Sequence, residues 1–373
     1  MNRDRALVRQ ECCFFREVST MGLPFRIVLP ELFQSLRRLV GFSQGIFVDV
    51  GPDLFPGYYY GHWDIPYQTS IGNILYGEFL TTGRLAEVLR SRAEILALPP
   101  IAHLEKLLLL SGDEYRRHDI YQRVARPAQV FHALYMKLAG LRDGRLGLML
   151  MNRPAGDQDF CSEEVRRLRD MIPFLSAAMG GYQSAPETWV DSCDQAIVVL
   201  DAGGKVQYYT DQGATLIPYA LDRRQRPMRR WKPFRTELVA RDILNTLVRR
   251  LRCLGGSGAE MRMPSLQRRN GWGRFEFRAR WLEPLESGET SLIAVTVIRQ
   301  VPLRLKLASD LRRFPLSARE FSVCLEIALG GSYKDIGKKL HLSEHTVVAH
   351  SRAIYEKLGI NGRSELLTQL YMH

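Results

Sequence analysis

Residues 330–360 read GGSYKDIGKKLHLSEHTVVAHSRAIYEKLGI, and this stretch decides the fold of the C-terminal part of the chain. Ser332 and Ser343 each precede a segment with apolar residues at helical spacing, and a serine at such a position caps the first backbone N–H groups of a helix. Gly359 follows the second segment and predicts its C-terminal end. Residues 341–343 lie between the two segments. The pattern therefore predicts two helices joined by a three-residue turn, which is a helix-turn-helix.

Two further helices flank this pair. Ser317 and Glu320 form a capping box, in which each side chain bonds to the other residue's backbone N–H, at the start of a segment that ends at Gly330. A last helical segment begins near Ser364. Together these patterns predict an all-α module of four helices over residues 314–373.

The helix predicted from Ser343 to Leu358 has two different faces. Its apolar stripe consists of Val347, Ile354 and Leu358. The opposite face carries His345, Val348, Ala349 and Arg352. A face of small and medium side chains can enter a DNA major groove, where Arg352 offers a two-pronged donor to guanine. Capped short helices also occur in bundles with no nucleic-acid partner, and the pattern alone leaves that alternative open.

The order of the individual residues is more specific than the helix pattern. L-S-x-R-E followed by G-x-S-x-K-D-I-G-K-K-L-x-L-S-E-H-T-V-x-x-H-x-x-x-I-Y-x-K-L-G-I closely resembles the LuxR-type output domain, over nearly all of residues 315–372. The resemblance implies a transcriptional regulator that binds double-stranded DNA as a homodimer, with the third helix in the major groove. The residues expected to face bases are His345, Val348, Ala349 and Arg352. The residues expected to face phosphates are Lys334, Lys338, Lys339, Thr346, Lys357 and Arg363.

One position departs from the family pattern. LuxR-type domains often have Lys or Arg where this chain has Val348, so a base-reading cation is absent there. Val348 offers only an apolar contact, for example to a thymine methyl group. Arg352 is then the one obvious base-reading cation of the predicted recognition helix. DNA affinity is expected to depend on the lysines of the second helix, on Arg363 and on dimer formation.

Residues 1–28 predict a loose or partly helical leader, and residues 29–183 predict a first α+β domain. The expected elements are strands at 45–50 and 146–151 and helical patterns at 72–110 and 118–139. The end of the domain has an Asp-Gly turn, a strand, a polar loop and the helix start F-C-S-E-E at 160–164. It resembles the end of a GAF domain, a small-molecule-binding or dimerising module with a central antiparallel sheet. Any α+β domain that closes with a strand and a helix would give the same pattern.

Residues 188–300 predict a second antiparallel domain. A hairpin over 195–209 comes first, and two long strands at 273–282 and 291–298 come last. This order resembles a PAS domain, a sensor fold that often precedes output domains, although the cysteine motif of flavin-photoadduct sensors is missing. Residues 301–313 are then a linker. The whole chain is expected to be an α+β multidomain protein, with two sensor domains before its DNA-binding module.

Residues 51–67 are rich in glycine, proline and aromatic side chains. The candidates for the wall of a small-molecule pocket are Tyr58, Tyr60, Trp63 and Tyr67, because such pockets are lined largely by aromatic and apolar groups. Acyl-homoserine-lactone sensors use the same residue types, but the spacing here does not match theirs. Packing of these rings in an apolar core is the alternative interpretation. The sequence identifies no cofactor and no particular effector.

The positive charge is concentrated away from the C-terminal module. The chain has a formal net charge of +12, and residues 221–280 hold 17 Arg and Lys against 5 Asp and Glu. Such a cluster can bind nucleic-acid phosphates or cover a solvated surface, and the second interpretation is the simpler one. Residues 301–373 hold 11 Arg and Lys against 7 Asp and Glu. Charge is therefore not the feature that predicts DNA binding.

Several classes of protein are disfavoured. No stretch approaches the roughly 18 apolar residues of a membrane span, and residues 1–17 lack the apolar core of a signal peptide, so a cytoplasmic location without membrane contact is expected. The cysteines have no zinc-site or disulfide spacing. The common hydrolase, Walker and cyclase patterns are missing, which predicts a protein that is not an enzyme. A sigma-factor-like protein also ends in a helix-turn-helix, but it would need a helical promoter-melting domain where strands are predicted.

Overall fold

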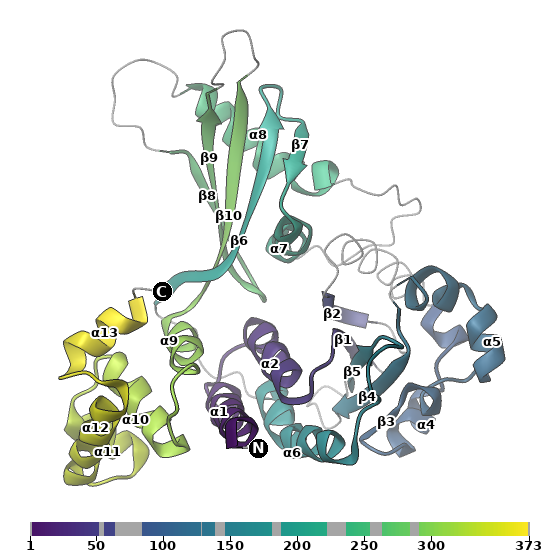
Figure 1. Cartoon of the computed structure of the whole chain (residues 1–373). Helices are drawn as coiled ribbons and strands as arrows, with labels where there is room; N and C mark the ends of the chain where they lie inside the picture. Colours follow the sequence, from purple (N-terminus) through teal and green to yellow (C-terminus); the bar gives the residue numbers. More distant parts are fainter. Residues whose placement is uncertain are drawn as a thin grey trace. The chain divides into compact units, whose positions relative to one another are not determined.

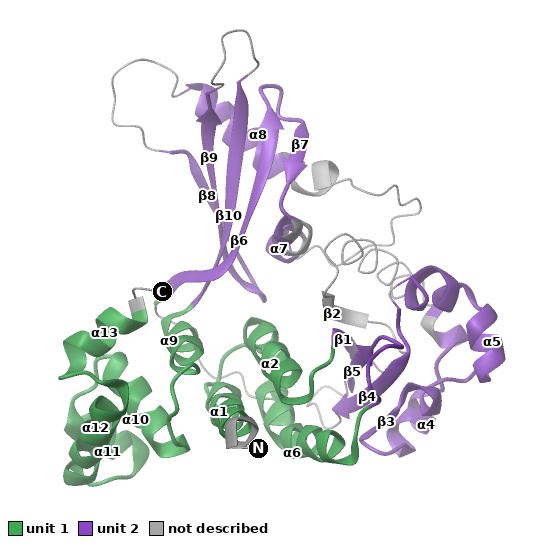
Figure 2. Cartoon of the chain, in the orientation of Figure 1, with its two compact units in different colours: residues 1–42, 160–188, 302–373 green, residues 43–159, 189–301 purple. Residues whose placement is uncertain are grey.

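The computed structural model describes residues 2–51, 56–63, 84–127, 129–138, 146–180, 188–221, 236–253, 263–283 and 291–371 (Figure 1). The chain divides into two compact units (Figure 2). The helical unit consists of residues 1–42, 160–188 and 302–373. The sheet unit consists of residues 43–159 and 189–301 and holds two β-sheets. None of the helices described is long and apolar enough to cross a membrane.

The first sheet has its strands in the order β2-β1-β5-β4-β3, and neighbouring strands are antiparallel. These strands are β1 (Gln44–Val50), β2 (Pro56–Trp63), β3 (Ile101–His103), β4 (His132–Leu138) and β5 (Leu146–Arg153). In β1, Phe47 pairs with Tyr60 of β2 on one side and with Met149 of β5 on the other. Every residue of β1 is buried. The strands predicted at 45–50 and 146–151 are confirmed.

The helical patterns predicted at 72–110 and 118–139 are wrong in part. The described residues of these segments form helices α4 (Arg92–Ala97) and α5 (Gly112–Arg117), short helical turns η1 (Arg84–Glu87), η2 (Leu104–Lys106) and η3 (Tyr121–Ala125), and also strands β3 and β4. Strand β4 lies between β5 and β3, and six of its residues are buried. A strand that is covered on both faces has a continuous apolar sequence, so its periodicity does not distinguish it from a helix.

The second sheet repeats this strand order, as β7-β6-β10-β9-β8. Its strands are β6 (Trp189–Asp201), β7 (Val206–Tyr209), β8 (Ser265–Asn270), β9 (Gly273–Leu282) and β10 (Leu292–Pro302), and they are joined by helices α7 (Asp211–Leu221) and α8 (Thr236–Cys253). Phe275, Phe277 and Ala279 of β9 are buried. The hairpin over 195–209 and the two long strands are confirmed. The sequence pattern does not predict β8.

The helical unit joins segments that lie far apart in the sequence. It consists of α1 (Asn2–Ser19), α2 (Phe25–Val40), α6 (Ser162–Gly180), α9 (Leu303–Leu311), α10 (Ala318–Ala328), α11 (Tyr333–Leu340), α12 (Glu344–Leu358) and α13 (Arg363–Tyr371). Helix α1 contacts α2 and α6, and also α9 and α10. Its side chains Phe14, Phe15 and Val18 are buried. The predicted leader thus contributes a packed helix, and the predicted linker 301–313 holds α9.

A buried carboxylate connects α1 to α2 and to the end of α9. Glu11 is 1% exposed and accepts hydrogen bonds from Ser35 at 2.6 Å and Arg38 at 3.3 Å. Its carboxylate also lies 3.5 Å from the buried Arg312 side chain, which the Phe14 ring covers at 4.4 Å. Burial lowers the pKa of the Arg312 guanidinium, and Glu11 opposes that effect. Because a buried charge needs a compensating charge, this contact is expected to be costly to break.

Glu11→Ala is expected to lower the free energy of unfolding of the helical unit by about 3–5 kcal/mol, because it leaves Arg312 buried without this carboxylate. The helical circular-dichroism signal during urea denaturation measures the change. Glu163→Ala is the control: Glu163 is 57% exposed in its ion pair with Arg167, and its loss should cost about 1 kcal/mol or less. Equal losses in the two variants would contradict the role given to Glu11.

Candidate nucleic-acid interface

Helix α10 packs against the other three helices of the C-terminal module, α11, α12 and α13. Its N-terminus has the predicted capping box: the Ser317 hydroxyl accepts from the Glu320 N–H at 3.4 Å, and the Glu320 carboxylate accepts from the Ser317 N–H at 2.8 Å. Phe321 and Cys324 are buried behind it, and burial raises the pKa of the Cys324 thiol to about 12. Burial alone would raise the pKa of Glu320, but hydrogen bonds from Lys357 and Ser317 hold it below its usual value. Helix α10 is thus fixed at its start and tied to α12.

The turn between α11 and α12 is tight. Ser332 caps α11 by accepting from the Asp335 N–H at 3.2 Å, and His341 ends the helix in the left-handed conformation, with φ 54°. The Leu342 N–H then donates to the Gly337 carbonyl at 2.8 Å. A Cβ atom placed on Gly337 would lie 2.8 Å from the Leu342 carbonyl oxygen, which is closer than side chains normally approach. Glycine at 337 therefore permits the turn, and the predicted helix-turn-helix is confirmed.

Helix α12 has one buried face and one exposed face. Ser343 caps it by accepting from the Thr346 N–H at 3.0 Å. Its buried residues are Val347, Ser351 and Ile354. The Ser351 hydroxyl is satisfied within the helix, because it donates to the Val348 carbonyl at 2.8 Å. Leu358, which the sequence predicts in the buried stripe, is half-buried.

The side chains predicted to face DNA bases lie together on the outer side of α12. His345, Ala349 and Arg352 are exposed, and Val348 is half-buried. Spacings of three, four and seven residues bring them to one helix face. The N-cap at Ser343 and the buried side chains on the opposite face fix the position of α12 in the module, so the exposed face has a defined orientation. The geometry suits insertion into a major groove.

The predicted phosphate contacts fall into two groups. Lys334, Lys338 and Arg363 are exposed. Thr346 is half-buried, and its hydroxyl lies 2.7 Å from the Ser343 hydroxyl at the start of α12. The other two residues, Lys339 and Lys357, are held by carboxylates of α10.

Two predicted phosphate contacts take part in ion pairs of the module. Lys357 lies 2.7 Å from both carboxylate oxygens of Glu320, and Lys339 lies 2.9 Å from Glu326. Glu326 is not among the site residues predicted from the sequence, although the sequence around it holds a signal. It is the one charged residue in the run VCLEIAL over 323–329. A carboxylate in such a run is buried with its helix face and needs cationic partners.

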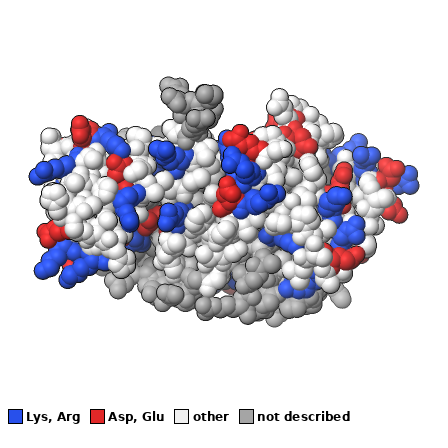
Figure 3. Space-filling model, turned by 90° about the horizontal axis from the view of Figure 1, so that it is seen from below, with Lys and Arg blue, Asp and Glu red and all other residues white. Residues whose placement is uncertain are grey.

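Charge is mixed on the one face of the molecule that Figure 3 draws. On the face drawn in Figure 3, Lys and Arg side chains are interspersed with Asp and Glu side chains. Of the basic segment 221–280, residues 222–235 and 254–262 lie outside the described residues, and Arg249, Arg250 and Arg252 of α8 are exposed. This distribution agrees with the view that charge alone does not mark the DNA-binding surface.

The aromatic segment predicted as a pocket wall is described only in part. Tyr60 of β2 is buried and stacks on Tyr219 of α7, with ring centroids 5.8 Å apart. The side chains of Tyr58 and Trp63, and the whole of Tyr67, lie outside the described residues. Tyr60 therefore packs in an aromatic cluster with Tyr219 and Trp272, which agrees with the alternative interpretation of core packing. The pocket stays a prediction.

Two helices joined at a tight turn, the second with an exposed face that holds the side chains predicted to face bases, define a helix-turn-helix module. Residues 315–370 match the family model described as bacterial regulatory proteins, luxR family. These residues form a LuxR-type domain, and the chain thus carries the DNA-binding domain of a transcription regulator. The resemblance seen in the sequence is confirmed over this range.

Several solved structures align with more of the chain, at low identity. The crystal structure of Escherichia coli SdiA is 10% identical, and the alignment covers 92% of this chain and 87% of that chain, with a TM-score of 0.29. SdiA in complex with octanoyl-rac-glycerol is 11% identical over 96% and 92%, with a TM-score of 0.29. The phage VqmA–DPO complex is 20% identical over 48% and 83%, with a TM-score of 0.19. A search of curated proteins finds no match.

Gly337→Ala is expected to destabilise the C-terminal module by about 1–3 kcal/mol, because the new Cβ must displace the Leu342 carbonyl. Hydrogen exchange of the α11 and α12 amides in the full chain measures the loss. Gly362→Ala is the control, since a Cβ there has no atom within 4 Å, and its effect should stay within about 0.5 kcal/mol. Wild-type protection in Gly337→Ala would show that the turn accommodates a side chain.

Proposed function

We propose that the protein is a sequence-specific transcriptional regulator that reads DNA bases with α12. It would bind phosphates with the lysines of α11 and with Thr346, Lys357 and Arg363. The exposed face of α12, with His345, Val348, Ala349 and Arg352, carries this proposal. The face is held by a capped helix whose other side is buried, so its side chains are positioned before DNA arrives. Such preorganisation limits the entropy lost on binding.

We also propose that the regulator acts as a homodimer in the cytoplasm and is controlled through its N-terminal domains. Two antiparallel sheets with the same strand order support a GAF-like domain over 29–183 and a PAS-like domain over 188–300. A small-molecule effector would bind one of these two domains, and the region around Tyr60 is the first candidate for its pocket. No catalytic role is proposed.

Selection of bound duplexes from a random-sequence DNA library tests the proposal directly. The full chain should enrich one sequence with two related half-sites, because a homodimer places two α12 helices on the DNA. Genome-wide mapping of bound DNA would then give the operators and the regulated genes. Recovery of duplexes with no common sequence would contradict sequence-specific binding.

Arg352→Ala is expected to weaken binding to the selected sequence by about 1–3 kcal/mol and to leave binding to random duplexes nearly unchanged, because a base contact discriminates between sequences. Titration of both duplexes by fluorescence anisotropy measures the two affinities. Arg166→Ala, at an exposed arginine of α6, is the control and should change neither. Equal losses on both duplexes would identify Arg352 as a phosphate contact.

Lys338→Ala is expected to weaken binding to all sequences alike and to reduce the slope of log affinity against log salt by about 0.9, the value for one phosphate contact. Titrations at several salt concentrations measure this slope. Lys106→Ala removes the same charge from an exposed position in the sheet unit and should leave the slope unchanged. A wild-type slope for Lys338→Ala would remove Lys338 from the interface.

A further inference from the structure

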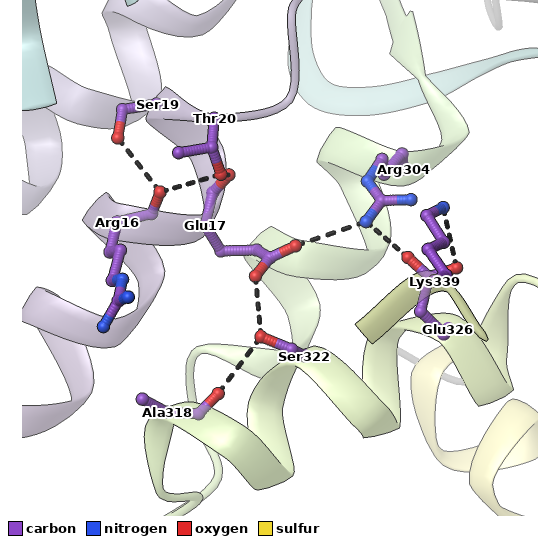
Figure 4. Close-up of polar contacts among 9 residues, drawn as sticks. All are labelled: Arg16, Glu17, Ser19, Thr20, Arg304, Ala318, Ser322, Glu326 and Lys339. Carbon is purple, nitrogen blue, oxygen red and sulfur yellow. Dashed lines mark hydrogen bonds and ion pairs between the residues drawn. The ribbon is translucent and has the colours of Figure 1, made fainter. Parts of the chain in front are cut away.

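The end of α1 is connected to the C-terminal module through one carboxylate. Glu17 accepts a hydrogen bond from the Ser322 hydroxyl of α10 at 2.9 Å and lies 3.2 Å from Arg304 of α9 (Figure 4). The last turn of α1 is closed beside it, because the Ser19 hydroxyl donates to the Arg16 carbonyl at 3.0 Å. Glu17 is therefore held where it faces both α9 and α10.

The chain of charges continues from Glu17 to a cation on α11. Arg304 also lies 2.5 Å from Glu326, and the second oxygen of Glu326 lies 2.9 Å from Lys339 (Figure 4). The side chains of Glu17, Arg304 and Glu326 are 17%, 25% and 7% exposed. Lys339, by contrast, is 53% exposed. These four residues join the N-terminal helix to a predicted phosphate contact.

The charge of Glu17 acts on Lys339 through Arg304. With Glu17 in place, one guanidinium is shared between two carboxylates, so Glu326 retains negative charge with which to hold Lys339. Without the charge of Glu17, Arg304 compensates Glu326 alone, and the attraction on Lys339 falls. Because the three inner groups are mostly buried, salt screens these interactions less than it screens surface pairs.

We infer that Glu17 lowers the affinity of the module for DNA, because it helps Glu326 to retain Lys339 and so opposes a phosphate contact. Glu17 is then a positioning residue that acts through Lys339. The inference rests on the proposed function, since it takes Lys339 to be a phosphate contact. DNA and Glu326 compete for one ammonium group. Any state in which α1 leaves α10 would make one more cation available to the DNA backbone.

Glu17→Gln tests the inference, because glutamine keeps the length of the side chain and can still accept from Ser322 while the charge is lost. The full chain is titrated with a random-sequence duplex at several salt concentrations, which gives both the affinity and its salt dependence. Glu17→Gln is expected to raise the affinity roughly threefold at low salt and to steepen the slope of log affinity against log salt by up to about 0.9. Glu17→Asp, which keeps the charge, should stay close to the wild type.

Lys339→Met identifies the cation through which Glu17 acts. It should weaken binding more in the Glu17→Gln background than in the wild type, and Glu17→Gln should have no effect in the Lys339→Met background. Glu105→Gln is the charge-matched control at an exposed position of the sheet unit and should leave binding unchanged. Ser322→Ala is a second variant for the case that Glu17→Gln unfolds. It loosens Glu17 without removing its charge and should raise the affinity to a smaller extent.

Several results would overturn the inference. One is an affinity of folded Glu17→Gln, or of Ser322→Ala in its place, that does not exceed that of the wild type. Another is a gain that persists in the Lys339→Met background or that Glu105→Gln matches, because net charge alone would then explain it. In either case Arg352→Ala still reports on sequence-specific binding, so the proposed function is tested by a separate measurement.

Discussion

The geometry of the DNA-binding module depends on the close approach of the Leu342 carbonyl to Gly337, where a Cβ atom would lie 2.8 Å from the carbonyl oxygen. Because residue 337 is a glycine, the chain can turn from α11 into α12 within three residues, and this turn sets how the two helices meet. The turn also determines where the lysines of α11 lie relative to the outer face of α12, which is the face predicted to enter a groove. The buried residues Val347 and Ile354 then fix the rotation of α12 about its own axis. The residues predicted to contact bases and those predicted to contact phosphates are in this way coupled through the backbone of the turn.

The parts that the sequence predicts well are those with local signals. Ser317, Ser332 and Ser343 precede their helices and cap them, because an N-cap is specified by one side chain and the backbone next to it. Gly359 ends α12 in the left-handed conformation, as its position indicates. The exposed face of α12 follows from helical spacing alone. These signals need no knowledge of the tertiary fold.

The parts that the sequence does not predict depend on distant partners. Strand β4 is a strand because β3 and β5 lie on its two sides, and its apolar run would suit a buried helix equally well. Glu326 and Lys339 form a pair across two helices, and Arg304 extends it to α1, which stands about 300 residues earlier in the chain. Such contacts between elements leave no periodic trace in either segment. The same holds for Glu11 and Arg312, whose pairing requires α1 to pack beside α9.

The burial of Cys324 gives the module a built-in chemical reporter. Its thiol is buried on α10, and this burial raises the pKa of the thiol to about 12, whereas Cys161, Cys193 and Cys253 are exposed. Since the thiolate is the form that reacts with alkylating reagents, Cys324 is protected both by its enclosure and by its lack of ionisation. Pulsed alkylation with site mapping would therefore measure the fraction of molecules in which the DNA-binding module has opened, and the three exposed thiols serve as an internal standard for the reagent.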